Sequence, residues 1–374
     1  MSTRIAIVHD WLTNLGGAER VVAAMLDAFP DADLFTSVYN PDRLDLFRGR
    51  EVRTTFLQHI PLAKKKHQLF SSMRRLAFEQ LDLSEYDVVI SSTTAEAKGV
   101  ITGERTKHIS YMHTPTRYFW SHYDQYLESP GFGILDPLAR WQLRRTIVRA
   151  REWDYAAAQR PDIVLANSKH VQKRIKKYYN RDSAVVYPIV DVERFTKAHP
   201  RPQLAPQRYA LVISRLVPYK RIDIAVEAAK RAQFPIVVIG TGPQESMLRK
   251  LAGADAIFLG EAPDAEVEAY LQHADVFLFP GEEDFGITPV ESMAAGTPVI
   301  AYAKGGVLET LTPEFGMFVS NQSSEGFADA LSIFNSDRYS VDELQKHAQA
   351  FSKKIFIQKF KDVVEQATDS RYAA

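Results

Sequence analysis

Short apolar runs that alternate with helix-like stretches occur twice along this chain, and this doubled pattern restricts the fold more than any other feature. The first series opens with Ile5–Val8, followed by a glycine-containing loop and a helix expected to end near Ala28. The second opens with Tyr209–Ser214, followed by a loop and a helix expected to end near Ala232. Continuous apolar runs of this length are typical of strands buried on both faces, and strands alternating with helices form parallel sheets. The sequence therefore predicts two doubly wound α/β domains.

Each opening is followed by further short β-branched runs, which we interpret as strands of the same sheet. These runs are residues 87–91, 108–112 and 163–166 in the first series, and residues 236–239, 256–259, 276–279 and 298–301 in the second. A chain of 374 residues is also too long for one core, at roughly 100–200 residues per domain. Open α/β sheets bind ligands at the carboxyl ends of their strands. Two such edges facing each other across a cleft would suit a two-substrate reaction.

The boundary between the two series is visible in the composition. Residues 198–208 hold three prolines and no apolar periodicity, which is typical of a surface connection. We place the hinge slightly earlier, so that the first domain covers residues 1–188 and the second covers residues 189–351. Residues 352–374 carry a separate apolar stripe with helical spacing.

The composition excludes several classes of protein. Apolar residues make up 45% of the chain and charged residues 25%, which is ordinary for a globular protein and excludes a disordered chain. There is no cysteine, which excludes disulfides, thiolate metal sites and cysteine nucleophiles. No run approaches the roughly 18 apolar residues of a membrane span, and the N-terminal apolar run is too short for a signal peptide. We therefore expect a cytoplasmic protein.

Charge is distributed unevenly although the net charge is zero. Residues 1–200 carry 29 Lys/Arg and 23 Asp/Glu, a balance of +6, and residues 201–374 carry 17 and 23, a balance of −6. A basic first half favours an anionic partner such as a phosphate or a membrane surface. No nucleic-acid motif accompanies the charge, so we expect no nucleic-acid partner.

The most informative segment is residues 279–300, in which a strand, a loop with three adjacent carboxylates and a helix follow one another. Thr288 and Pro289 fit the N-cap and the first position of that helix. Glu291 then stands three residues after the cap, where a capping box would place it. A purely local role for Glu291 is therefore one open interpretation.

A ligand-binding interpretation includes Glu283, eight residues before Glu291. On one continuous helix the two would lie about 12 Å apart. Gly286 and Pro289 interrupt the helix, so Glu283 can fold back over its start. Carboxylates accept hydrogen bonds from sugar and ribose hydroxyls, and a helix start attracts an anion such as a diphosphate.

This segment resembles the E-x7-E motif of glycosyltransferase family 4, whose members adopt the GT-B fold. In that family a Glu-Gly-Phe-Gly loop precedes the helix carrying the second Glu; here Asp284 replaces the first glycine of the loop. The resemblance implies two facing Rossmann-like domains with a cleft between them and a C-terminal helix crossing back to the first. It also implies donor contacts from Phe285, Gly286 and Ile287, with Glu291 on the ribose.

Further features of the family occur in the same order in the second domain. Arg215 and Lys220 resemble its basic pair that neutralises the donor diphosphate, and two cations in one loop suit an anion clamp. Gly242 lies in a segment like the family's Gly-x-Gly-Pro turn, although tight turns of this kind are common. Glu261 lies in a loop like the one that frames the nucleotide base.

The first domain carries three matching positions. Gly16 and Gly17 resemble the glycine loop that lets backbone N–H groups approach a phosphate. His113 follows an expected strand; it could be held by backbone alone, but family members place a histidine here against the donor sugar. Arg117 could contact a phosphate or the acceptor. The segment His113–Tyr118 is most similar to bacterial transferases of polysaccharide and O-antigen assembly, several of which use GDP-mannose.

Residues 64–77 interleave basic and apolar side chains with helical spacing. Two interpretations stay open, namely a membrane-surface helix that would suit a lipid-linked acceptor and a solvated helix packed on the domain. A later row of arginines is interpreted as a solvated helix face; its members are Arg140, Arg144, Arg145 and Arg149.

Together these features predict a retaining glycosyltransferase of polysaccharide or O-antigen biosynthesis. It would transfer mannose from GDP-mannose to a saccharide acceptor, which we expect to be lipid-linked. The predicted catalytic residues are His113, Arg215, Lys220 and Glu283. No residue stands out as a nucleophile, so we expect a front-face mechanism in which the leaving diphosphate takes the acceptor proton. We expect neither a metal nor another cofactor, because the cations can stabilise the diphosphate.

Three alternatives remain. The donor could be a UDP-sugar or another nucleotide sugar. The protein could be a nucleotide-sugar 2-epimerase of the same architecture, which would turn over without an acceptor. It could also be a non-catalytic subunit that binds the donor without turnover, although the presence of both glutamates and both cations argues against this.

Overall fold

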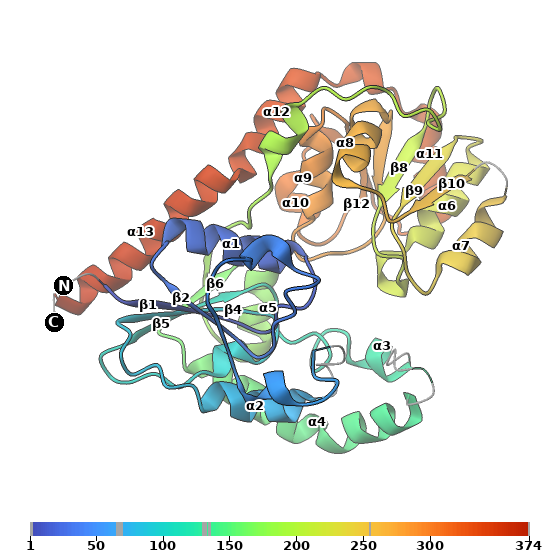
Figure 1. Ribbon diagram of the computed structural model, residues 1–374. Coiled ribbons are helices and arrows are strands. Elements are labelled where there is room, and N and C mark those ends of the chain that lie inside the picture. Colours follow the sequence, from blue (N-terminus) through green and yellow to red (C-terminus); the bar gives the residue numbers. More distant parts are fainter. Residues whose placement is uncertain (1–2, 65–69, 129–132, 134–135, 254–255, 373–374) are drawn as a thin grey trace. The chain divides into compact units, whose positions relative to one another are not determined.

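The computed structural model describes residues 3–64, 70–128, 133, 136–253 and 256–372. The chain divides into two compact units, one formed by Met1–Pro188 with Phe356–Ala374 and the other by Ile189–Ile355. The chain therefore passes between the units twice, first after Pro188 and again within the last helix. Each unit is an α/β layer structure with a parallel sheet between helices (Figure 1).

The first unit holds a seven-stranded parallel sheet with the order β3-β2-β1-β4-β5-β6-β7. The strands are β1 (Ile5–His9), β2 (Asp33–Thr36), β3 (Val52–Thr54), β4 (Val88–Thr93), β5 (Lys107–Met112), β6 (Ile163–Ala166) and β7 (Ala184–Val185). The helices are α1 (Gly17–Ala28), α2 (Ser71–Glu79), α3 (Tyr123–Glu128), α4 (Asp136–Gln159), α5 (Lys169–Tyr179) and α13 (Lys353–Tyr372), which begins in the second unit. The chain reverses its direction across the sheet between β1 and β4, which makes that the topological switch point.

The second unit holds a six-stranded parallel sheet with the order β10-β9-β8-β11-β12-β13. The strands are β8 (Ala210–Ile213), β9 (Ile236–Ile239), β10 (Ala256–Gly260), β11 (Val276–Phe279), β12 (Val299–Tyr302) and β13 (Gly316–Val319). The helices are α6 (Ile222–Arg231), α7 (Glu245–Ala252), α8 (Asp264–His273), α9 (Ile287–Ala294), α10 (Val307–Thr310), α11 (Ser324–Ile333) and α12 (Val341–Ala348). Its switch point lies between β8 and β11.

The strands predicted from apolar runs are confirmed to within two residues, and except for the half-buried edge strand β10 most of their residues are buried. The short strands β3, β7 and β13 were not predicted. Each pairs with one neighbour at or near the edge of its sheet, and β3 and β7 contain only half-buried or exposed residues. Their conformation is fixed by hydrogen bonds to a neighbouring strand rather than by a hydrophobic pattern of their own.

Helix α13 buries the apolar stripe that the sequence predicts for the tail. Phe356, Phe360 and Val364 are buried, and the rings of Phe356 and Phe360 both make edge contacts with Tyr111 of β5. Ile355 lies outside this stripe and is exposed. The last helix thus completes the hydrophobic core of the first unit, although it follows the second unit in sequence.

Buried ion pairs fix the loops that follow β4 and β5. Arg74 of α2 donates to Glu96 over 2.9 Å, and both side chains are at most 2% exposed. Lys98 lies 2.7 Å from Asp154 of α4, again with almost no exposure. Asp154 also accepts a hydrogen bond from Thr116, in the turn after β5. These contacts hold the carboxyl ends of two neighbouring strands in one arrangement.

His108 on β5 makes the first unit sensitive to acid. The side chain is buried, and burial lowers its pKa from 6.5 to about 4. The unfolded state therefore binds a proton at His108 more tightly than the folded state does. As the pH falls from 6.5 towards 4, protonation favours the unfolded state, and the free energy of unfolding decreases by about 3 kcal/mol. We expect His108→Gln to reduce the loss of unfolding free energy between pH 7 and pH 4.5, measured in urea titrations. An unchanged pH dependence would contradict this.

Candidate functional site

The predicted residues of the second unit lie along one edge of its sheet. All six strands run parallel, so the loops after β8, β9, β10 and β11 leave from the same edge. Arg215 and Lys220 follow β8, Gly242 follows β9, and Glu261 follows β10 as an exposed residue. Glu283 follows β11. The fold therefore brings residues separated by up to 68 positions to one edge of the sheet. The switch point lies at this edge, between β8 and β11.

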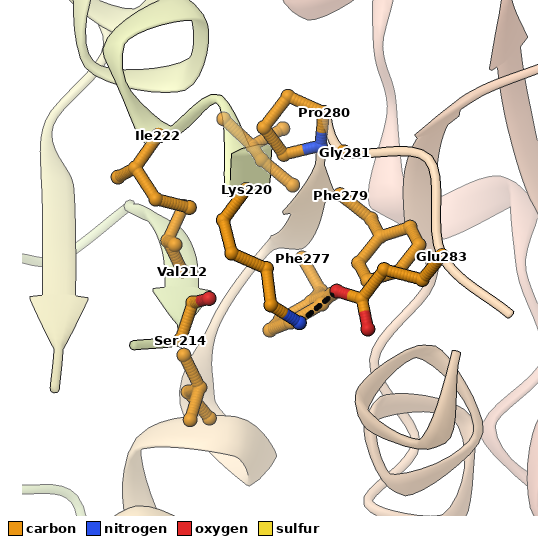
Figure 2. Close-up of a pocket in the computed structure, with 11 residues that line it drawn as sticks. Val212, Ser214, Lys220, Ile222, Phe277, Phe279, Pro280, Gly281 and Glu283 are labelled. Carbon is orange, nitrogen blue, oxygen red and sulfur yellow. Dashed lines mark hydrogen bonds and ion pairs between the residues drawn. The ribbon is translucent and has the colours of Figure 1, made fainter. Parts of the chain in front are cut away.

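A pocket lies at this switch point, between the ends of β8 and β11 (Figure 2). Its floor is apolar and its polar groups come from Ser214, Lys220 and Glu283. The other lining residues are Val212, Ile213, Ile222, Phe277, Leu278, Phe279, Pro280 and Gly281. An apolar pocket with a few convergent polar groups at a switch point is the usual form of a ligand site in such sheets.

Lys220 and Glu283, which both line this pocket, form an ion pair in which Lys220 Nζ donates to a carboxylate oxygen (Figure 2). Their side chains are 16% and 21% exposed, so solvent still reaches the pair. Gly281 lets the two loops approach, because a Cβ there would lie 3.0 Å from the carbonyl oxygen of Lys220. The pair sets a cation beside an anion, an arrangement that can accept phosphate oxygens and hydroxyl groups from one ligand.

Arg215 lies in the same loop but outside this pocket lining. Its side chain is exposed, and the guanidinium donates to the Tyr219 hydroxyl over 2.7 Å. The structure therefore brings Lys220 and Glu283 together and leaves Arg215 at the surface of the loop. Gly242 supports that loop from β9, since a Cβ there would lie 2.4 Å from the carbonyl oxygen of Leu216. A steric role thus accounts for Gly242 without a ligand.

Helix α9 begins differently from the prediction. It starts at Ile287, and its N-cap is Gly286, whose φ of 89° favours glycine. Thr288 lies inside the helix, and no side chain caps its start. The predicted Thr288 cap and the capping-box interpretation of Glu291 are therefore wrong, because the left-handed Gly286 ends the carboxylate loop two residues earlier than Thr288 would.

Glu291 lies half-buried on α9, close to a group of charges that the sequence analysis missed. Burial would lower the pKa of Arg194, but the hydrogen bond to Glu268 and the charges of Glu291 and Asp264 raise it. Arg194 donates to Glu268 over 2.9 Å. Arg194 is distant from Glu291 in sequence and belongs to no motif there, so only the packing of residues 192–196 beside α9 reveals it.

Phe285 is part of the core of the second unit. It is 3% exposed, and its ring makes an edge contact with Phe351, with the centroids 5.6 Å apart. The ring is covered by protein, so any contact of Phe285 with a donor would come from its backbone, and its place in the donor site stays a prediction. The ring anchors the loop between Glu283 and the start of α9.

Gly305 and Gly306 brace the carboxylate loop and were missed in the sequence analysis. Gly306 N–H donates to the carbonyl oxygen of Glu283 over 2.8 Å, and Glu283 and Gly305 form a parallel bridge. A Cβ on Gly305 would lie 2.4 Å from that same carbonyl oxygen. The available signal was a glycine pair in the loop after the predicted strand 298–301, which is a pattern of close backbone approach.

The first unit places its predicted residues at the carboxyl edge of its own sheet. Gly16 is the N-cap of α1, and Gly17 is the first residue of that helix. A Cβ on Gly16 would lie 2.9 Å from a carboxylate oxygen of Glu19. Arg117 lies in the turn after β5, where its carbonyl oxygen accepts from the backbone of His122 over 3.0 Å and its side chain is half-buried.

His113 belongs to a buried polar chain that the sequence did not reveal. Its Nε2 lies 2.9 Å from Ser92 Oγ, and Ser92 also contacts His9, whose Nδ1 lies 2.9 Å from the Ser92 carbonyl oxygen. Because that carbonyl only accepts, His9 Nδ1 carries a proton. Glu19 lies 3.7 Å from His9 Nε2. Ser92 and His9 thus hold the imidazole of His113 in one orientation.

Glu19 also sets the charge of His9. Burial alone would lower the pKa of His9, but the nearby Glu19 carboxylate and the charge of Asp10 raise it above the usual value. Asp10 itself accepts from the backbone N–H groups of Thr94, Ala95 and Ala97, so it ties β1 to the loop after β4. These residues come from β1, α1 and the β4 loop, which only the fold brings to one place.

The described part of segment 64–77 packs partly on the first unit, as the second of the two interpretations expects, and no observation tests the membrane contact. Residues 65–69 lie outside the described part of the chain, and helix α2 begins at Ser71. Arg74 is buried on Glu96, and Arg75 stacks on the rings of Phe119 and Trp153. Both arginines therefore point towards protein, and the basic face predicted for this helix is wrong at these two positions.

Two family models match the chain. Residues 194–354 match the model described as glycosyl transferases group 1, and residues 15–194 match glycosyltransferase family 4. Among curated relatives, a GDP-mannose-dependent monoacylated alpha-(1-6)-phosphatidylinositol monomannoside mannosyltransferase of Corynebacterium glutamicum is 32% identical over 167 residues, 38% of this chain and 44% of the relative. D-inositol 3-phosphate glycosyltransferase of Mycobacteroides abscessus is 26% identical over 293 residues, 68% of this chain and 65% of the relative. The matches thus span about half to two thirds of these relatives.

Solved structures share the architecture over nearly the whole chain. Anabaena HepE in complex with UDP-glucose superposes with a TM-score of 0.69 at 19% identity, covering 97% of this chain and 99% of that one. Sucrose-phosphate synthase from Thermosynechococcus elongatus superposes with a TM-score of 0.72 at 17% identity, covering 99% and 100%. Because the two family matches together span residues 15–354 and these structures share both sheets, the protein belongs to glycosyltransferase family 4 and has the GT-B fold.

Proposed function

We propose that this protein transfers a sugar, with retention at the anomeric carbon, from a nucleoside diphosphate sugar to a hydroxyl group of a saccharide acceptor. The observation that carries the proposal is the Lys220–Glu283 ion pair at the switch-point pocket of the second unit. An ammonium and a carboxylate side by side match the phosphate and the hydroxyl groups of one donor molecule. Family membership supports the same activity.

In this proposal the donor replaces the partners that Lys220 and Glu283 have in the free protein. The ammonium of Lys220 moves to the diphosphate and stabilises the negative charge that grows as the sugar–phosphate bond breaks. The carboxylate of Glu283 then accepts hydrogen bonds from the sugar. Arg215 is exposed in the same loop and supplies a second cation, and the leaving diphosphate takes the proton of the acceptor hydroxyl.

The remaining predicted residues have supporting roles. His113, held by Ser92 and His9, would contact the donor sugar, and Glu291 would hold the ribose. Because Lys220 and Arg215 supply positive charge, we propose that transfer needs no metal ion. Chelation with EDTA should therefore leave the initial rate of transfer unchanged, and a loss of rate that added magnesium restores would contradict this.

We propose GDP-mannose as the donor and a lipid-linked saccharide as the acceptor. Relatives from Corynebacterium glutamicum and Mycobacterium tuberculosis are named GDP-mannose-dependent mannosyltransferases acting on phosphatidylinositol mannosides. A UDP-sugar is the second candidate, because HepE is described in complex with UDP and UDP-glucose. Polysaccharide biosynthesis in the cytoplasm, at the inner membrane surface, is the corresponding setting.

A thermal-shift panel tests the donor, using GDP, UDP, ADP, dTDP and their sugar conjugates without metal. A ligand at one hundred times its Kd stabilises the folded state by about 2.7 kcal/mol, so binding raises the melting temperature. We expect GDP and GDP-mannose to give the largest shift, and Glu291→Ala to reduce it. A shift with UDP compounds instead would select the second candidate. If none of the nucleotides raised the melting temperature, even in the presence of a saccharide acceptor, the proposed donor site would be overturned.

An acceptor assay separates transfer from the two other functions that the sequence leaves open. Transfer predicts that donor consumption depends on added acceptor and yields a glycosylated product. Conversion of free UDP-sugar without acceptor would identify an epimerase instead. Donor binding without any turnover would identify a non-catalytic subunit.

A further inference from the structure

Helix α4 exposes an apolar stripe along its outer face, away from the core of the first unit. The stripe is formed by Leu138, Trp141, Val148 and Tyr155, whose exposed fractions lie between 42% and 63%. The spacing of three and seven residues puts them on one side of the helix, at 100° per residue. Single exposed apolar residues are common on protein surfaces, but four in one row on one helix indicate a contact surface.

The opposite side of α4 packs on the core of the first unit. Ile147, Ala150 and Asp154 are buried there, and Asp154 is tied to Lys98 and Thr116. Residues of the stripe lie roughly half a turn away from these positions. The outer stripe therefore contributes little to the core of this unit, and stability of the fold does not explain it.

Positive charge surrounds the first half of the stripe. Between residues 137 and 151 the helix carries five arginines and no carboxylate. Arg144, Arg145 and Arg149 are exposed, and Arg145 lies over the exposed ring of Trp141, 4.9 Å from its centroid. Arginine keeps its charged end in water while its stem covers apolar surface, and tryptophan favours the boundary between water and lipid.

We propose that this outer face of α4 binds the surface of a membrane that contains anionic phospholipids. Apolar side chains would enter the headgroup region while the flanking arginines contact lipid phosphates, which is the pattern of an interfacial helix. Charge complementarity selects this occupant. In a symmetric dimer that paired residues 137–151 with the same residues of a second copy, arginines would lie opposite arginines without a carboxylate in that stretch; exposed Glu152 is the first carboxylate after it.

The neighbouring helix α2 also exposes apolar side chains. It packs beside α4, where the indole N–H of Trp153 donates to Glu79 over 2.9 Å and Arg75 stacks on the same ring. Met73 and Leu76 of α2 are exposed. Within the described residues, no helix is long and apolar enough to cross a membrane. The proposed contact is therefore a surface attachment.

Co-sedimentation with vesicles tests this proposal on the full-length protein. We expect binding to vesicles of phosphatidylcholine mixed with phosphatidylglycerol, and little binding to phosphatidylcholine alone. Each arginine near an anionic surface contributes roughly five-fold to partitioning, so Arg144→Gln/Arg145→Gln/Arg149→Gln should weaken binding by at least about 30-fold. Trp141→Gln/Val148→Gln should also weaken binding, and emission from Trp141 should shift to the blue on mixed vesicles.

Matched variants in the second unit serve as controls. Arg231→Gln/Arg249→Gln/Lys250→Gln removes the same charge from exposed positions, and Ile333→Gln removes an exposed apolar side chain. Both should bind vesicles as the wild type does. Equal loss in the control triple variant would overturn the proposal, as would absence of binding to anionic vesicles. A concentration-dependent dimer abolished by Trp141→Gln/Val148→Gln would identify a protein interface instead.

This inference is independent of the proposed transfer reaction, because vesicle binding is measured without donor or acceptor. Each α4 variant should keep the nucleotide-induced thermal shift of the wild type. If the protein binds vesicles but no nucleotide, the membrane inference stands and the proposed function fails. If it binds nucleotide but no vesicles, the proposed function stands and the membrane inference fails.

Discussion

Replacing Lys220 by alanine should lower kcat by about 10²–10³-fold, because removing one preorganised group that stabilises transition-state charge costs about that much. The loss should appear at saturating donor, since the ammonium acts on charge that develops as the bond breaks. Lys220→Arg keeps a cation and should retain more activity than Lys220→Ala. Initial rates of nucleoside diphosphate release, measured over a range of donor concentrations, give kcat and KM separately.

Unfolding of the variant has to be excluded as the cause of such a loss. Lys220 and Glu283 are 16% and 21% exposed, so the pair lies between exposed pairs, which contribute at most about 1 kcal/mol, and fully buried pairs, whose disruption costs about 3–5 kcal/mol. Rates are therefore measured at a temperature at which the melting curve of Lys220→Ala shows the variant to be folded. Lys250→Ala, at an exposed position on α7, is the matched control and should keep full activity. Retention of the wild-type kcat by Lys220→Ala would remove Lys220 from the proposed site.

Replacing Arg74 by alanine should destabilise the first unit by about 3–5 kcal/mol, the usual cost of leaving one partner of a buried ion pair without the other. Burial would raise the pKa of Glu96, but the charge and hydrogen bonds of Arg74 hold it below its usual value. Glu96 also accepts hydrogen bonds from Ser71 over 2.7 Å and from Tyr118 over 3.0 Å. Without Arg74 these hydroxyls cannot compensate for a buried negative charge. Urea titrations of the variant measure the loss.

A second substitution separates this electrostatic cost from lost packing. Arg74→Ala/Glu96→Gln removes the buried charge while its amide still reaches both hydroxyls, so it should recover much of the stability. The sign of the pH effect is a further check. The pKa of Glu96 is lower in the folded state than in the unfolded state. The Arg74–Glu96 pair therefore stabilises the wild type at pH values above the unfolded-state pKa, and this contribution is lost as the pH falls. The difference between wild type and Arg74→Ala should therefore shrink on acidification. A constant difference, or no recovery in the double variant, would show that packing dominates.

Local patterns were enough to predict most of the fold. Runs such as Ile236–Ile239 and Val276–Phe279 are buried on both faces and consist of β-branched and aromatic residues, so their conformation follows from their own composition. The start of α9 could not be predicted in this way. Thr288 and Pro289 fit a helix start in sequence, but the left-handed Gly286 ends the loop earlier because Gly305 and Gly306 brace the loop backbone.

The sequence by itself determined the two parallel sheets, the carboxylate loop and the candidate cations, because each depends on neighbouring residues and on the strand-end rule. The tertiary structure alone decided which side chains meet. It paired Lys220 with Glu283, placed Arg194 near Glu291, linked His113 through Ser92 to His9 and Glu19, and turned the outer face of α4 away from the core. Those outcomes depend on strand order and on residues tens of positions apart, which no local pattern encodes.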